Sequence, residues 1–337
     1  MKMLNSVKLT KIDILFILFL ILFSIYFYMH ITMIVNPTID GADYLLNANG
    51  WLSNEPLYAP FKPPLISWTI AGIWLITSES WIVIQYLLPA FTLAAGVTLY
   101  ALLRKQKGEL FAFGVSALTL VNQIVFFWGM QIQTESLSLF FLILSLFLLK
   151  SEKEKHWYLA GVAIGLTFAS RYPIFIPALT ILIAGSVIQR NSKLVKKAII
   201  TCVPVMTLVI VSIFLKTGAF SGALERDTQF TFLLSPLYTL HSVHTWSLVV
   251  FLVPIAFLFR RTYSDKNNYT YIAWFLVSLL FWSANTTNFQ ERFMIHSTPA
   301  VYYLSMIAIE NFTKINISKV SLSRVRRHFV GKDSRRK

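Results

Sequence analysis

Long runs of apolar residues, separated by short polar stretches, occupy most of this 337-residue chain. Several runs reach the ~20 residues that a helix needs to cross a ~30 Å hydrocarbon core. The pattern predicts an all-α polytopic membrane protein with about ten transmembrane helices. The first run is too long for a signal-peptide core and lacks a small-residue cleavage site, so we interpret it as a retained signal anchor. The predicted spans are 12–35, 81–103, 109–130, 135–149, 156–170, 172–189, 198–215, 246–259, 269–285 and 293–310.

Composition supports the membrane class. Hydrophobic residues make up 56% of the chain and charged residues 13%, and the mean hydropathy is +0.62. These values exclude an ordinary soluble domain. The single cysteine, Cys202, lies inside an apolar run, which excludes a disulfide framework and a cysteine-based metal site.

The net charge of +15 comes from residues that set orientation. With a cytoplasmic N-terminus and ten spans, twenty-five of the thirty basic residues lie on the cytoplasmic side, nine of them in a tail at 314–337. We therefore predict a multi-pass protein of the cell membrane with both termini in the cytoplasm. It would consist of a transmembrane domain, residues 1–313, and a basic tail that contacts membrane lipids rather than nucleic acid.

The same count leaves five basic residues on the outer side, which orientation does not explain. They are Lys62, Arg171, Lys216, Arg226 and Arg292. Eight carboxylates share that side: Asp40, Asp43, Glu55, Glu79, Glu135, Glu225, Asp227 and Glu291. We therefore predict an outer-face site of mixed charge.

Two outer loops are long. The first, 36–80, contains the semi-apolar stretch Leu65–Thr77, which we expect to lie along or dip into the membrane interface as short helices. The second covers 216–245 and contains His241 and His244. Two histidines without a third ligand are a weak signal, so no metal site is predicted.

The first loop contains the most informative residues. Asp40 and Asp43 would share one face of a helical turn, although solvated carboxylates, with Asp40 as a helix N-cap, are an alternative. Lys62 precedes two prolines that stiffen the backbone, which suits a contact to a phosphate oxygen. Alone, this segment predicts only a turn.

Three further charged residues lie at predicted span ends. Glu135 begins the fourth span, where it either interacts with the helix dipole or belongs to the site. Arg171 offers a rigid fork for phosphate oxygens, or it snorkels to lipid headgroups. Arg292 either contributes to the site or forms a local ion pair with Glu291.

Together these motifs resemble the GT-C superfamily of membrane glycosyltransferases, in the branch of protein O-mannosyltransferases and lipid A aminoarabinose transferases. The resemblance covers roughly residues 10–310. The matching segments are Asp40-x-x-x-Tyr44, Tyr58, Lys62-Pro-Pro-Leu65 and Trp68 in the first outer loop, Thr134-Glu135-Ser-Leu137, the glycine-rich stretch from Gly161 through Gly165 to Arg171, Tyr172 and Pro177, and Glu291-Arg292-Phe293 with Pro299. One departure is Gly41, where the family usually has Glu after Asp; Asp43 would replace that carboxylate.

The resemblance implies a GT-C-like fold and a hexosyl or pentosyl transfer with inversion. The donor would be a polyprenyl-phosphate sugar and the acceptor a hydroxyl of a lipid, glycan or protein on the extracytoplasmic face. Asp40 would be the base, Asp43 or Glu135 would orient the acceptor or a cation, and a divalent cation remains open. Lys62, Arg171 and Arg292 would bind the donor phosphate.

A lipid or solute transporter or flippase without chemistry is the main alternative. It would favour internal repeats, which this chain lacks, and charges at mid-membrane depth. A structural subunit is a third possibility. The glycosyltransferase hypothesis requires Asp40 to lie in one cavity with Lys62 and Arg171.

Overall fold

The computed structural model describes residues 9–189, 191–218, 248–284 and 291–319, and every regular element among them is a helix. The tail beyond 319 and much of the second outer loop, including Arg226, His241 and His244, lie outside the described residues. The elements are α1 (Lys11–Ile31), α2 (Ile39–Leu52), α3 (Pro64–Trp74), α4 (Trp81–Leu87), α5 (Ala90–Lys107), α6 (Glu109–Val121), α7 (Gln123–Gly129), α8 (Thr134–Leu149), α9 (Glu154–Ser170), η1 (Tyr172–Ile174), α10 (Phe175–Gln189), α11 (Ser192–Thr217), η3 (Leu248–Phe251), α13 (Leu252–Phe257), α14 (Arg260–Ser264), α15 (Lys266–Ala284), η4 (Glu291–Ser297) and α16 (Thr298–Lys319).

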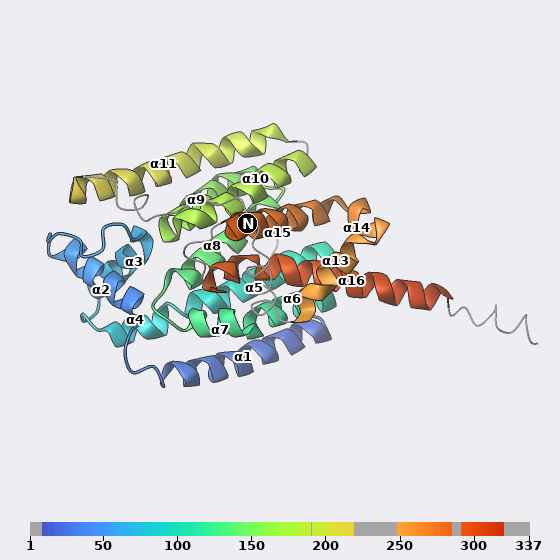
Figure 1. The fold of residues 1–337 in the computed structure, drawn as a ribbon, viewed down its shortest axis with the longest axis horizontal. Coiled ribbons are helices and arrows are strands. Elements are labelled where there is room, and N and C mark those ends of the chain that lie inside the picture. The colour runs from blue at the N-terminus through green and yellow to red at the C-terminus, as the bar shows by residue number, and fades with distance from the viewer. Residues whose placement is uncertain (1–8, 190, 219–247, 285–290, 320–337) are drawn as a thin grey trace, which may run out of the picture.

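The helices form an elongated bundle with two distinct ends (Figure 1). Helices α1 and α11 run along opposite sides, and α5, α6, α8 and α16 lie between them. Helices α2, α3 and α4 gather at one end, here called the α2 end, and α14 lies at the other, the α14 end. The short basic loops meet at the α14 end, where Lys107 pairs with Asp265 at 2.6 Å and Lys150 donates to Asn267 at 3.2 Å.

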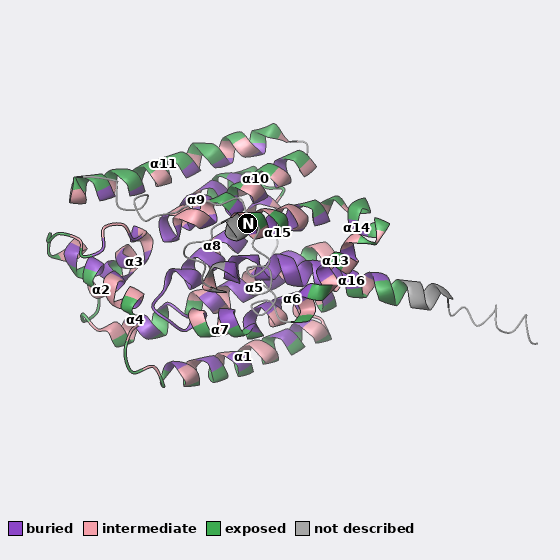
Figure 2. Ribbon diagram, in the orientation of Figure 1, coloured by how far each residue is buried: buried purple, intermediate pink, exposed green. Residues whose placement is uncertain are grey.

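Helix α8 is the centre of the bundle, and most of its residues are buried. It packs between α5 and α9. Helix α9 in turn lies unusually close to α11, because a Cβ on Gly161 would lie 2.0 Å from the carbonyl oxygen of Ala198. Small residues allow such close approach of membrane helices. Figure 2 shows the buried residues concentrated in the middle and exposed residues along α1 and α11. Those exposed residues include Leu22 and Leu215, as expected of a surface that faces lipid.

Each of the ten predicted spans is mostly helical over its described residues, although the first helix ends at Ile31 rather than at residue 35, and the number of membrane crossings stays a prediction. Among the described residues, α1, α11 and the unit Trp81–Lys107 are individually long and apolar enough to cross a membrane. Helices α6 and α7 pass the same test together and bend by 60° at their break, where the Asn122 side chain caps α7. Helix α8 has 16 residues, or about 24 Å at ~1.5 Å per residue, which is short of the ~30 Å core.

The first outer loop has the expected short helices. Helices α2 and α3 pack against each other through Tyr44, Ala48, Ile66 and Ile70, in a small core that also includes residues of α4 and α8. Pro64 is the first residue of α3, a position where a backbone N–H would have no acceptor within the helix, so the absence of this N–H costs no hydrogen bond. This subassembly at the α2 end holds the carboxylates and the lysine of the loop in fixed positions.

Candidate active site

Helix α2 presents Asp40 and Asp43 on one face. Thr38 is the N-cap of this helix, and its hydroxyl oxygen accepts a hydrogen bond from the Gly41 N–H at 3.1 Å. The alternative in which Asp40 itself caps the helix is therefore wrong. Asp40 lies in the first turn and Asp43 about one turn later, as the spacing predicts.

Lys62 is held by a turn that is anchored to α2. The Asn47 side chain donates to the carbonyl of Ala59 and accepts from its N–H, both at 2.9 Å. The Lys62 N–H then bonds to the same Ala59 carbonyl at 3.1 Å. As a result the buried Lys62 ammonium pairs with Asp40 and with Asp43, the latter at 3.0 Å, and lies 5.1 Å from the centre of the Tyr44 ring.

Glu135 and Arg171 form a second buried pair. Glu135 lies in the first turn of α8 and is 1% exposed. Its carboxylate accepts from the guanidinium of Arg171, which follows the last residue of α9 and also donates to the Thr134 hydroxyl at 3.2 Å. Arg171 is only 9% exposed, so the interpretation of a snorkelling arginine is wrong. Glu135 binds a side chain from another helix and does more than offset the dipole of α8.

Arg292 joins the two pairs. Its guanidinium lies 2.7 Å from the Asp40 carboxylate and 3.7 Å from that of Glu135, and it donates to the Gln133 side chain at 3.3 Å. The same group lies 5.0 Å from the centre of the Trp128 ring. Arg292 therefore contacts side chains that are distant in sequence, and the side chain of Glu291, its predicted local partner, lies outside the described residues.

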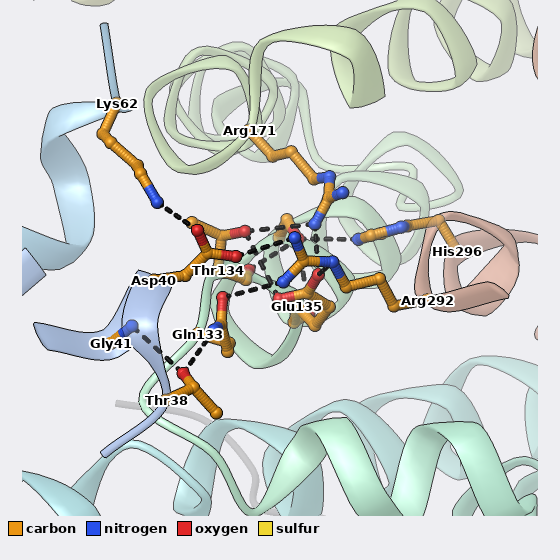
Figure 3. Close-up of polar contacts among 11 residues, drawn as sticks. Thr38, Asp40, Gly41, Lys62, Gln133, Thr134, Glu135, Arg171, Arg292 and His296 are labelled. Atoms are coloured by element: carbon orange, nitrogen blue, oxygen red, sulfur yellow. Dashed lines mark hydrogen bonds and ion pairs between the residues drawn. The ribbon is translucent and has the colours of Figure 1, made fainter. Parts of the chain in front are cut away.

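The six predicted site residues thus form one chain of alternating charges, which we call the charge network; Figure 3 labels all of them except Asp43. Its contacts connect, in order, Asp43, Lys62, Asp40, Arg292, Glu135 and Arg171. Asp40 reaches Lys62 directly and Arg171 through Arg292 and Glu135. Three carboxylates and three cations balance, so the network has no formal net charge.

The cations control the protonation of Asp40. Burial raises the pKa of this carboxyl group, but hydrogen bonds from Lys62 and Arg292 outweigh burial and hold the pKa below its ordinary value. Asp40 is therefore ionised at neutral pH and able to accept a proton.

Sequence reasoning missed several polar residues that support the network. Gln133 donates to the Thr38 hydroxyl at 2.7 Å and so ties the start of α8 to the start of α2. One turn into α8, the Ser138 hydroxyl lies 2.6 Å from Nε2 of His296, which is buried. The polar run before α8 and a lone histidine in an apolar segment were the available signals, but neither indicates its partner.

Among the described residues, the other charged side chains predicted on the outer side make no ion pair with the network. Lys216 instead donates to Asn54 at 3.1 Å, and Glu55 and Glu79 are exposed. Gly41, the departure from the family pattern, lies where α2 meets the segment before α8. A Cβ on Gly41 would be 3.0 Å from the carbonyl oxygen of Ile132, so a larger side chain would separate the two segments.

Carboxylates within the network are matched to cationic side chains of the protein. Among the described residues, no group of three or more His, Cys, Asp and Glu side chains is arranged to hold a metal ion. Whether activity requires a divalent cation is therefore to be tested with a chelator.

Comparisons with known proteins agree with this architecture. Residues 61–215 match the family described as dolichyl-phosphate-mannose-protein mannosyltransferase. The crystal structure of ArnT from Cupriavidus metallidurans in the apo state superimposes with a TM-score of 0.69 and 12% identity, covering 87% of this chain and 59% of that one. The chain has a GT-C fold. The resemblance that the sequence motifs indicated is thereby confirmed.

A second GT-C structure extends the comparison. ArnT from the same organism bound to undecaprenyl phosphate gives a TM-score of 0.65 and 11% identity, with 87% of this chain and 60% of that chain covered. This chain thus spans about three-fifths of the ArnT chains that it matches. No curated protein sequence gives a significant match. Lys62, Glu135 and Arg171 lie within the family match, whereas Asp40 and Arg292 lie outside it.

Proposed function

We propose that this protein is an integral membrane glycosyltransferase that acts on a polyprenyl-phosphate-linked sugar. It transfers a hexosyl or pentosyl group to a hydroxyl of a lipid, glycan or protein on the extracytoplasmic face, and it inverts the anomeric centre. The charge network is the observation that supports this proposal, because it joins a carboxylate base to three cations within one site. The name of the matched family and the undecaprenyl phosphate bound to ArnT favour a donor of this chemical class.

The reaction requires one base and cationic stabilisation of the leaving group. A glycosidase needs a second carboxyl group to protonate its leaving alkoxide. A polyprenyl phosphate is stable as an anion, so it needs cations rather than an acid. Asp40 takes the proton of the acceptor hydroxyl as the new C–O bond forms, and the electron pair of the broken bond leaves with the phosphate. Lys62, Arg171 and Arg292 stabilise the charge that develops there.

Donor binding and base strength are coupled in this arrangement. Lys62 and Arg292 both contact Asp40, and these contacts lower the pKa of its carboxyl group. A shift of either cation toward a phosphate oxygen would weaken that contact and make Asp40 a stronger base. The base would thus be strongest when the donor is in place. Asp43 and Glu135 keep the cations oriented while this shift occurs.

The proposal is tested with purified full-length protein in lipid vesicles and radiolabelled polyprenyl-phosphate mannose, glucose and aminoarabinose. Transfer of label to an acceptor from at least one donor is the expected result. Movement of the lipid across the bilayer without transfer would instead indicate a flippase, and neither outcome would indicate a structural subunit. Repeating the assay with a chelator then shows whether a divalent cation is required.

A further inference from the structure

A second polar site lies at the α14 end of the bundle, away from the charge network. Here the end of α5, the end of α8 and the starts of α9 and α15 surround a cavity of about 220 Å³. Since ~10–15 Å³ of such volume holds one water molecule, the cavity has room for a small hydrated group. It is lined by Lys105, Gln106, Lys150, Ser151, His156 and Asn267, with Leu102 and Phe147 as its apolar part.

The polar lining contains two lysines, a histidine, two amides and a hydroxyl, but no carboxylate. Lys150 donates to the Asn267 side chain at 3.2 Å, and Lys105 lies 5.1 Å from the centre of the Phe147 ring. The neighbouring carboxylate of Asp265 is bound to Lys107 at 2.6 Å. The cavity is therefore positively charged without a paired anion in its wall, in contrast to the balanced charge network.

Two ordinary explanations account for lysines at this end but not for the cavity. Cytoplasmic loops of membrane proteins are enriched in Lys and Arg, and cations at helix C-termini offset the helix dipole. Lys105 lies in the last turn of α5 and Lys150 is the C-cap of α8, so both effects apply. Neither effect requires that the lysines share a cavity with other hydrogen-bond donors.

Gln106 is the observation that points to a ligand. Its side-chain oxygen accepts from the hydroxyl of buried Tyr271 at 3.1 Å, which fixes the amide. Its Nε2 is buried and has no hydrogen-bond partner among the described residues. Buried donors are almost always satisfied, and an anion in the adjoining cavity would satisfy this one.

We propose that this cavity binds the phosphate group of an anionic ligand through Lys105, Lys150 and Gln106. A lipid headgroup or free phosphate would supply the same chemistry. Burial lowers the pKa of Lys150, and an anion beside it would favour its charged form. The topology predicted from the basic residues makes this site cytoplasmic, so it is separate from glycosyl transfer and does not depend on it.

The test measures lipid retention by the full-length chain in neutral detergent, using native mass spectrometry. We expect one phosphatidylglycerol to be retained in preference to phosphatidylcholine. The double variant Lys105→Gln/Lys150→Gln should weaken that retention at least about tenfold, because each lysine near an anionic lipid contributes roughly fivefold. The matched control is Lys153→Gln/Lys155→Gln, which removes the same charge from exposed residues outside the cavity lining.

A parallel titration with inorganic phosphate, read as a shift in thermal unfolding, separates the two sources. If lipid retention is lost in the cavity-lysine variant, the cavity binds a lipid headgroup. If inorganic phosphate raises the unfolding temperature only when the cavity lysines are present, and lipid is not retained, the cavity binds free phosphate. Equal losses in both double variants, or no preference for either ligand, would overturn the proposal. If Lys150→Gln lowers the unfolding temperature by itself, the single variant Lys105→Gln decides, because this side chain is exposed. Wild-type binding by that variant would also overturn it.

Discussion

Buried carboxylates occur at both ends of this bundle, and they are satisfied in different ways. At the α14 end, Asp13 accepts hydrogen bonds from the Thr10 N–H and hydroxyl at 2.7 and 3.0 Å, from the Tyr100 hydroxyl at 2.6 Å, and from Arg104 at 2.7 Å. Each of these donors contacts the carboxylate directly. At the α2 end, Lys62 is shared by two carboxylates, and so is Arg292.

The difference lies in what an added anion would do. Around Asp13, Arg104 also lies 3.9 Å from the Glu109 carboxylate, but the capping box of α1 and the Tyr100 hydroxyl hold Asp13 in place with neutral donors. That arrangement joins α1 to α5. In the charge network, each shared cation can redistribute its hydrogen bonds toward a phosphate without leaving a carboxylate entirely unpaired. A buried carboxylate therefore indicates a reactive site only when the cations paired with it can form hydrogen bonds to a bound anion instead.

The largest expected effect contrasts Asp40 with Asp13. Asp40→Asn keeps the volume of the side chain but removes the proposed base, so transfer should fall by about 10³-fold. Asp13→Asn should lower the unfolding temperature yet leave transfer per folded molecule within about threefold, because Asp13 has a structural role. Both are measured with the labelled donor after correction for folded protein. Equal losses of transfer in the two variants would remove the distinction between the ends.

The next effect concerns stability. Glu135→Gln leaves the buried Arg171 without its carboxylate and Arg292 with Asp40 alone, which should lower the free energy of unfolding by about 3 kcal/mol. The matched variant at the α14 end is Asp265→Asn. Its pair with Lys107 is more exposed, so about 1 kcal/mol or less is expected there. Thermal unfolding in detergent compares them, and a larger loss in Asp265→Asn would contradict this assignment of burial.

Sequence reasoning found the members of the charge network but not their pairing. The positive-inside pattern left five basic residues unexplained, and three of them, Lys62, Arg171 and Arg292, join the network. Lys216 met the same criterion and bonds instead to Asn54. Contacts between residues far apart in the chain depend on how the helices pack, which local patterns do not encode.

The fold likewise combines features that local sequence predicts with features that depend on distant segments. Apolar runs located the helices, because hydrophobic length and burial are local properties. They could not predict that a 60° bend divides the third span, since the Asn122 side chain that caps α7 looks like any polar residue within an apolar run. They also could not predict how closely Gly41 approaches a distant segment. A Cβ on Gly41 would lie 3.0 Å from the backbone oxygen of Ile132.

Gly41 gives a prediction of moderate size. Gly41→Ala places a Cβ 3.0 Å from the Ile132 carbonyl oxygen, and such overpacking costs about 1–3 kcal/mol. Because α2 supports Asp40, transfer should fall about tenfold as well. The control is Gly72→Ala in α3, whose Cβ would meet nothing within 4 Å. The free energy of unfolding of that variant should rise by roughly 0.5–1 kcal/mol, because alanine has a higher helix propensity than glycine. Unchanged stability in Gly41→Ala would show that α2 can move away from Ile132 without loss.

The smallest expected effect is a change in pH dependence. Because the folded pKa of Asp40 lies below its ordinary value, the contribution of its ion pairs to stability is present above the unfolded pKa and is lost as pH falls through the folded pKa. Transfer should therefore be constant with respect to this group from about pH 5 upward, and kcat/KM should fall only at more acidic pH. Lys62→Gln removes one of the two cations that lower this pKa, so the acidic limb of the kcat/KM profile should move to higher pH.

Lys216→Gln is the matched control, because this lysine, also predicted to lie on the outer side, bonds to Asn54 and not to the charge network. Its acidic limb should coincide with that of the wild type. Loss of a phosphate contact in Lys62→Gln would lower kcat/KM at every pH without moving the limb, so a displaced limb reports the effect of Lys62 on Asp40 specifically. A lower kcat/KM with the limb unmoved would mean that Arg292 alone sets the protonation of Asp40, and the coupling between donor binding and base strength would then be assigned to Arg292.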